Sequence, residues 1–273
     1  MPESHSTPES GNASMNWRLE RRNGVVYFRV PEPGLSCIFT TRTEGVSTGH
    51  YESLNLAYGN GDDPERIRRN YSRLCAAFAV DRVLTLKQQH SPEVLYINYD
   101  KTPSEVLEGD AMFTDCRGLA LGIKVADCLP IFLVGLDHPV VGAAHAGWRG
   151  TRDRIATRLV AAIRRKFEIR PERLAYAFGP CIGRDCYEVG EDVAYQFTSS
   201  FEAPDEFLRP KTDVTDATKF LLDLKAVNRR LLQGQGLVEL ADLDQCTHCT
   251  PGLFYSARRD GVTGRNLALI VRR

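Results

Sequence analysis

Hydrophobic positions along the chain form short continuous runs that alternate with stripes of helical period. The continuous runs are rich in Val, Ile, Leu and Phe, and such runs predict buried strands. They lie at residues 24–30, 36–42, 94–99, 118–127, 129–135, 139–147 and 267–273. Polar, turn-forming residues bound most of them, so the predicted strands are short.

Three other segments carry a single apolar stripe and predict helices. Residues 62–80 begin with Asp63, which can accept backbone hydrogen bonds at a helix start, followed by Pro64. From Thr151 the apolar residues recur every four positions, and residues 222–236 end in glycine. Because strands and helices mix along the chain, the pattern predicts an α/β or α+β fold with mixed sheets.

The chain shows no internal repeat and no Pro/Gly/Ser-rich linker after its N-terminal segment. We therefore expect one domain at residues 17–273. Residues 1–16 are polar and rich in Ser, Pro and Glu, which predicts a disordered tail rather than a secretory signal. The longest apolar stretch carries Lys124, Asp127 and Pro130, so no membrane span is expected.

Composition adds information on partners and compartment. The 273 residues hold 35 basic and 35 acidic side chains, so net charge gives no reason to expect a nucleic-acid or membrane partner. Eight cysteines without a secretory signal favour free thiols in a reducing compartment, which predicts the cytoplasm.

Three chemically versatile residues end apolar segments: His90, Cys128 and His145. Two imidazoles and a thiolate suit zinc, and three protein ligands leave a fourth position open for catalysis. Spacing alone favours a packed thiol and two hydrogen-bonded imidazoles, because the three positions are far apart in the sequence. A third interpretation makes Cys128 a nucleophile that His145 activates, as in cysteine hydrolases.

Two segments carry candidate ligand-binding residues. Residues 147–154 place a glycine-rich turn and Arg149 before a predicted helix, which suits an anion such as phosphate. Residues 40–56 form a long polar loop in which Arg42 and Asn55 could bind a polyhydroxylated ligand. The alternatives are a basic surface turn and an ordinary surface loop.

Acidic and cysteine-rich motifs complete the candidates. Asp62 and Glu188 are candidate proton carriers, although turn and helix-start carboxylates are common. Cys246 and Cys249 form a C-x-x-C motif within CTHC. Because no second pair lies at a matching distance, we interpret them as packed free thiols.

Several of these segments occur together in one order: TTRTEGVSTGHYESLNL, QQHS, ADCLP, AHAGWRG, GPCIGRDCYEVG and YSARRDGVTGR. From about Phe28 to the C-terminus the chain resembles the laccase-domain family, whose members are also called polyphenol oxidases, purine nucleoside phosphorylases or peptidoglycan editing factors. The resemblance implies a single-domain α/β/β/α sandwich with mixed β-sheets. It also implies one zinc ion bound by the residues that match its motifs, His90, Cys128 and His145.

The resemblance further implies a zinc-dependent purine nucleoside phosphorylase that acts on adenosine, inosine and methylthioadenosine and also deaminates adenosine. Its partners would be purine nucleosides and phosphate, and the chain would be a monomer or homodimer. Arg42, Asn55 and Arg149 would contact substrate. Besides Cys128, the expected catalytic residues are the proton carriers Asp62 and Glu188.

Two other activities stay open. Cu²⁺ competes well for nitrogen and sulfur ligands, so a copper-dependent phenol oxidase is an alternative. With 6 histidines and no H-x-H pair, the chain does not predict a multicopper cluster. Editing of cell-wall peptide precursors would instead use Cys128 and His145 as a hydrolase pair. A non-catalytic binding module is disfavoured by the expected open coordination position.

Overall fold

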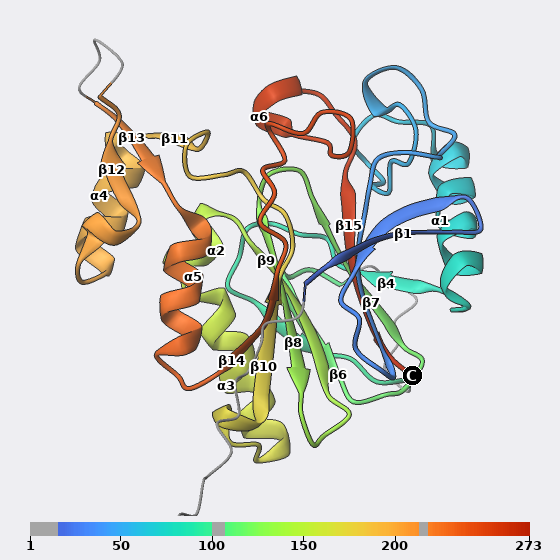
Figure 1. Ribbon diagram of the computed structural model, residues 1–273, viewed down its shortest axis with the longest axis horizontal. Coiled ribbons are helices and arrows are strands. Elements are labelled where there is room, and N and C mark those ends of the chain that lie inside the picture. The colour runs from blue at the N-terminus through green and yellow to red at the C-terminus, as the bar shows by residue number, and fades with distance from the viewer. Residues whose placement is uncertain (1–15, 100–106, 213–217) are drawn as a thin grey trace, which may run out of the picture.

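The structure is a computed structural model that describes residues 16–99, 107–212 and 218–273. The disordered tail predicted at residues 1–16 lies, up to residue 15, outside the described residues. Two large sheets face each other, and helices lie on both outer sides (Figure 1).

The first sheet contains six strands. In spatial order they are β1 (Arg18–Arg22), β2 (Val25–Arg29), β3 (Leu35–Thr40), β15 (Asn266–Arg272), β7 (Ala120–Val125) and β4 (Val83–Thr85). Neighbours pair antiparallel except β4 and β7, which run parallel, so the sheet is mixed.

The second sheet also contains six strands. In spatial order they are β14 (Val238–Asp242), β10 (Leu174–Phe178), β8 (Leu129–Gly135), β9 (Val141–Ala146), β6 (Ala111–Thr114) and β5 (Val94–Tyr96). The two outermost pairs are parallel and the central ones antiparallel. All seven predicted strands are confirmed by the two sheets, although β5 is shorter than its apolar run.

A smaller sheet lies at one end of the molecule beside helix α4 (Figure 1). Its strands are β11 (Glu188–Gly190), β13 (Lys219–Leu222) and β12 (Leu208–Pro210). Sequence analysis did not predict it, because strands of three or four residues are too short to show a period.

Helix α1 (Pro64–Phe78) covers the outer face of the first sheet, and α2 (Trp148–Arg152), α3 (Ile155–Phe167) and α5 (Leu224–Gln233) lie on the side of the second. Helix α4 (Glu191–Ser200) packs against the smaller sheet, and the short α6 (Ala257–Asp260) precedes β15 (Figure 1). Short 3₁₀ turns add η1 (Gly49–Tyr51), η3 (Pro171–Arg173) and η4 (Pro204–Glu206). None of the helices described here is both long and apolar enough to cross a membrane.

Three apolar layers hold these elements together. The innermost lies between the two sheets and includes Phe39, Ile123 and Phe132. One outer layer packs α1 against the first sheet through residues such as Leu74 and Leu269; the other packs α3 and α5 against the second sheet. The α/β/β/α sandwich is therefore confirmed.

The chain between β9 and α3 differs from its prediction. One helix was expected from Thr151, but α2 ends at Arg152 and Arg154 has a left-handed backbone with φ 61°. The Asp153 carboxylate accepts two hydrogen bonds from the Arg152 guanidinium, at 2.7 and 2.8 Å. The Asp153 backbone carbonyl accepts one from the Arg158 side chain. These contacts stabilise the break, so the long apolar stripe begins only at Ile155.

Candidate functional site

Three side chains that are distant in sequence meet at one end of the sandwich. Cys128 Sγ lies 3.8 Å from His90 Nε2, and the centroids of the His90 and His145 rings are 4.7 Å apart. One ligand atom from each residue lies within 4.8 Å of the other two. A thiol and two imidazoles at these separations can hold one metal ion.

Cys128 lies where the chain crosses from one large sheet to the other. Strand β7 ends at Val125 in the first sheet, and β8 begins at Leu129 in the second. Between them Asp127 has φ 94°, a conformation that is costly for a residue with a side chain. Its carboxylate accepts the Thr247 hydroxyl at 2.6 Å and the Arg258 backbone N–H at 2.7 Å. These contacts fix the turn that presents the thiol.

His145 owes its position to the alternation of β9. Val141 and Ala143 face the apolar layer between the sheets, and His145 follows them with the same two-residue period. It pairs with Pro130 near the start of β8, so the imidazole lies close to the crossing that carries Cys128.

A buried carboxylate holds both histidines. Asp110 is fully buried and accepts a hydrogen bond from His145 Nδ1 at 2.7 Å and from the His90 backbone N–H at 3.0 Å. It also accepts the backbone N–H groups of Gln89 and Ser91, at 3.0 and 2.7 Å, and the Ser91 hydroxyl at 2.9 Å. Such a partner orients the ring and leaves Nε2 of His145 as the nitrogen available to a metal. Asp110 is not among the residues predicted from the sequence; its one signal there is its position directly before the buried run of β6.

Electrostatics favours charged forms in this group. Burial opposes ionisation of Asp110, but hydrogen bonds from His145, Ser91 and Gln89 outweigh it and hold the pKa of the carboxyl well below its usual range. Burial likewise opposes the Cys128 thiolate, yet the neighbouring His145 lowers the thiol pKa to about 6. A thiolate is the form that binds metal.

Gly147 leaves the room that the ligands occupy. A Cβ atom at this position would lie 2.9 Å from both Cys128 Sγ and His90 Cδ2, closer than such atoms approach in proteins. Glycine is therefore required for the three ligands to meet at the start of α2.

The three side chains line a cavity of about 600 Å³. Four basic side chains line it: Lys87, Lys124, Arg258 and Arg265. Asp127 is the acidic residue in the described lining. Aromatic side chains form part of the wall: Tyr58, Trp148 and Tyr187. The cavity thus combines a candidate metal centre with groups that suit an anion and a flat aromatic ligand.

Comparison with known proteins identifies the family. A family model described as multi-copper polyphenol oxidoreductase laccase matches residues 36–273. The chain belongs to this laccase family. A relative from Deinococcus radiodurans named purine nucleoside phosphorylase is 41% identical over 250 residues, covering 90% of this chain and 93% of the relative.

Two further relatives extend the comparison. A protein from an unknown prokaryotic organism, named adenosine deaminase RL5, is 34% identical over 254 residues. The match covers 88% of this chain and 95% of the relative. The crystal structure of YlmD from Geobacillus stearothermophilus superposes with a TM-score of 0.86 at 31% identity, covering 96% of this chain and 100% of that one. The predicted family and fold are confirmed.

Two of the predicted site residues, Asn55 and Asp62, do not line the cavity of this laccase-family chain but support a residue that does. Asn55 is fully buried; its amide donates to Asp62 at 2.8 Å, and its carbonyl oxygen accepts the Arg265 backbone N–H at 2.9 Å. The described lining contains Arg265 but neither Asn55 nor Asp62. The pair therefore supports a cavity residue.

The remaining predicted residues also lie outside the described lining. Arg149 stacks on Trp148 with its guanidinium 4.3 Å from the ring centroid. The Glu188 carboxylate accepts Lys211 at 3.0 Å, and its carbonyl accepts the Arg258 side chain at 2.7 Å.

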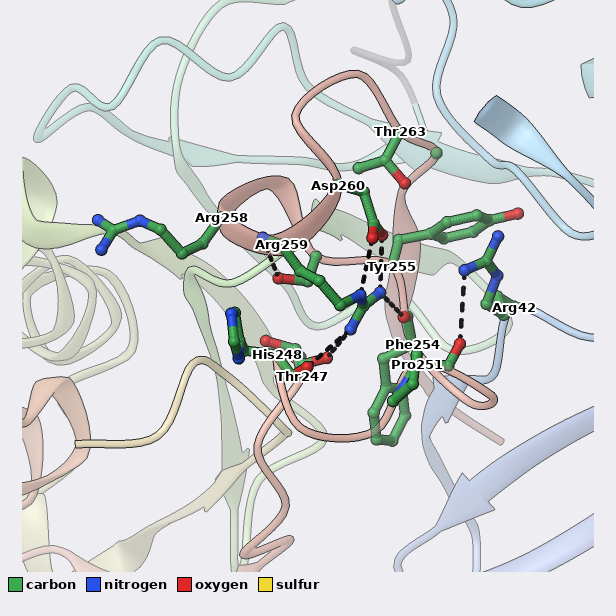
Figure 2. A network of polar contacts seen from close by, with 12 residues as sticks. Arg42, Thr247, His248, Pro251, Phe254, Tyr255, Arg258, Arg259, Asp260 and Thr263 are labelled. Carbon is green, nitrogen blue, oxygen red and sulfur yellow. Dashed lines mark hydrogen bonds and ion pairs between the residues drawn. The ribbon is translucent and has the colours of Figure 1, made fainter. Parts of the chain in front are cut away.

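Arg42 belongs to a separate network near the C-terminal loop. Its guanidinium stacks on Tyr255 at 4.5 Å from the ring centroid and donates to the Pro251 carbonyl at 3.4 Å (Figure 2). It does not line the cavity described above.

Proposed function

We propose that this chain is a purine nucleoside phosphorylase that also deaminates adenosine, with one zinc ion held by His90, Cys128 and His145. The observation that carries the proposal is the convergence of these ligands at a cavity lined by four cationic side chains. The names of the two relatives, a purine nucleoside phosphorylase and an adenosine deaminase, support the substrate class.

The donor set fits zinc. Three protein ligands with an accessible remaining position are typical of catalytic zinc sites. Among the described residues, no other histidine joins this group, whereas a multicopper centre needs many imidazoles. When bound, zinc supplies Lewis-acid polarisation and lowers the pKa of bound water to about 7.

The cationic wall would bind phosphate. Arg258 and Arg265 present guanidinium groups that match phosphate oxygens in pairs, and Lys124 adds a point charge. Burial lowers the pKa of Lys124, as the nearby Arg265 does to a lesser extent. A dianionic ligand between these cations would relieve their mutual repulsion.

The aromatic wall would bind the purine. Tyr58 is 53% exposed and stacks on Tyr71, with ring planes 6° apart, so its ring is held by Tyr71. Trp148 is held in turn by Arg149. Asn55 and Asp62 would act as positioning residues, through the backbone of Arg265, and Glu188 through the side chain of Arg258.

The predicted location follows from the thiols. All eight cysteines are free in the structure. We therefore propose the reducing cytoplasm as the compartment in which the chain acts.

The test uses purified protein with adenosine or inosine, with and without inorganic phosphate. We expect phosphate-dependent release of adenine or hypoxanthine, and inosine formed from adenosine. His145→Ala should abolish both reactions and release the zinc, whereas His50→Ala, at an exposed position, should change neither. Turnover that survives complete zinc removal would overturn the proposal in favour of a cysteine-hydrolase mechanism. Full activity only after copper loading would favour the phenol oxidase.

A further inference from the structure

A second group of metal-binding side chains lies outside the cavity. Cys186 Sγ and Cys249 Sγ are 3.3 Å apart, although 63 residues separate them in sequence. One nitrogen of His248 lies within 4.8 Å of both sulfurs. We propose that Cys186, His248 and Cys249 bind a second ion of the zinc class and that Cys246 provides the fourth ligand.

Cys246 belongs to this group through its backbone surroundings. Its sulfur accepts the Gly183 backbone N–H at 3.1 Å, and it lies in the same C-x-x-C turn as His248 and Cys249. A sulfur in the same turn as two of the proposed ligands is placed to complete a set of four.

The sulfur separation fits an ion better than a disulfide. Two thiolates bound to zinc at about 2.3 Å in tetrahedral geometry lie about 3.8 Å apart, whereas bonded sulfurs lie about 2.05 Å apart. At 3.3 Å, the pair would have to open by about 0.5 Å for zinc and close by more than 1 Å for a disulfide. The His248 imidazole beside both sulfurs would have a function as a zinc ligand but none beside a disulfide.

The two segments that carry the ligands are already joined without a metal. Cys181 and Cys246 form a parallel bridge, and the Thr247 backbone N–H donates to the Cys181 carbonyl at 3.0 Å. The Arg259 guanidinium donates to the carbonyls of Thr247 and His248 at 2.7 and 2.9 Å (Figure 2). Because these hydrogen bonds hold the loop that carries the ligands, an ion would bind a preorganised turn.

The second centre lies next to the supports of the first. Thr247, between two of the proposed ligands, donates its hydroxyl to Asp127, the residue before Cys128. Cys186 directly precedes Tyr187, which lines the cavity. A second ion would therefore fix both the Asp127 turn, which positions Cys128, and the aromatic side chain of Tyr187 in the cavity wall.

The test counts metal in untagged protein dialysed against zinc under reducing conditions. We expect about two equivalents of zinc in the wild-type chain, and about one in either Cys128→Ser or Cys186→Ser. The double variant should bind none. Cys116→Ser, at a free half-buried thiol elsewhere, is the matched control and should keep both equivalents.

Cobalt substitution identifies the ligands independently. Thiolate-to-cobalt absorption should be stronger at the second centre than at the first, because it has three sulfurs rather than one. Cys246→Ser should weaken this absorption, and an unchanged spectrum would remove Cys246 from the ligand set.

Two results would overturn the second site: a single equivalent of zinc in wild-type protein with a one-thiolate cobalt spectrum, or a Cys186–Cys249 disulfide in protein kept under reducing conditions. Both measurements use wild-type protein, so they test the second site even where a variant fails to fold. Neither depends on nucleoside turnover, so failure of the proposed activity would be seen separately.

Discussion

Replacing Asp110 by Asn tests whether this buried carboxylate holds the two histidines of the proposed metal site. The change keeps size and shape but removes one of two acceptor oxygens. Oδ1 accepts from His145 Nδ1 and the His90 backbone N–H, and Oδ2 accepts the Gln89 and Ser91 N–H groups and the Ser91 hydroxyl. An amide can satisfy only one of these sets.

The expected loss follows from the tautomer of His145. If the amide oxygen stays with Gln89 and Ser91, the NH₂ group faces His145 Nδ1, which must then accept a hydrogen bond. The ring proton moves to Nε2, the nitrogen that the metal needs. If the oxygen faces His145 instead, the NH₂ group opposes two N–H donors and displaces the loop that carries His90. Either way we expect zinc affinity to fall about 10- to 100-fold, or about 1.4–2.7 kcal/mol.

The assay is competition for zinc with a chromophoric chelator, in a Cys186→Ser background so that only the first centre titrates. Asp115→Asn is the matched control: Asp115 follows the same strand, accepts the Tyr96 hydroxyl at 2.8 Å, and an amide oxygen can replace it there. This variant should bind zinc as the parent does. An Asp110→Asn chain that folds and binds zinc with unchanged affinity would refute the argument.

Three further changes test the surroundings. Gly147→Ala should abolish zinc binding at the first centre, because its Cβ would collide with two ligands, whereas Gly252→Ala, which meets nothing within 4 Å, should leave metal content unchanged. Asn70→Ala should lower the free energy of unfolding by about 2–3 kcal/mol in denaturant titration, since this buried amide makes four hydrogen bonds to residues 46–55; a loss below 0.5 kcal/mol would contradict its role. Arg258→Gln should raise the KM for phosphate roughly tenfold with zinc content unchanged, and an unaltered KM would exclude this side chain from phosphate binding.

The sequence predicts those features that depend on local periodicity and capping. Asp63 accepts the Glu65 backbone N–H at 2.8 Å and starts α1 as expected. The helix predicted in residues 222–236 is α5, whose first turn is capped by Asp223. The alternation of β9 places His145 on the same face as Ala143. Family motifs then connect this histidine to Cys128 and His90, which periodicity alone does not do.

Features that depend on long-range contact leave little trace in the sequence. Asp110 is an ordinary acid until the fold brings residues 89–91 and His145 around it. The turn at Asp127 has φ 94° because Thr247 and Arg258 hold its carboxylate, and neither residue is near in sequence. Asn55 is a candidate ligand residue because polar loops often bind ligands; its burial and its contact with the Arg265 backbone depend on the fold.

The same limit explains the different interpretations of the two cysteine groups. CTHC has no second pair at zinc spacing in the sequence, which predicts packed thiols; the fold brings Cys186 to Cys249 from 63 residues away. The two centres also differ in the number of sulfurs. One thiol and two imidazoles face a cavity, which suits exchange of a fourth ligand. The second group holds two thiols and one imidazole, and the proposed addition of Cys246 would complete a tetrahedron without substrate. The chemistry of each set therefore agrees with the two proposals, catalysis at the first centre and support of the Asp127 turn at the second.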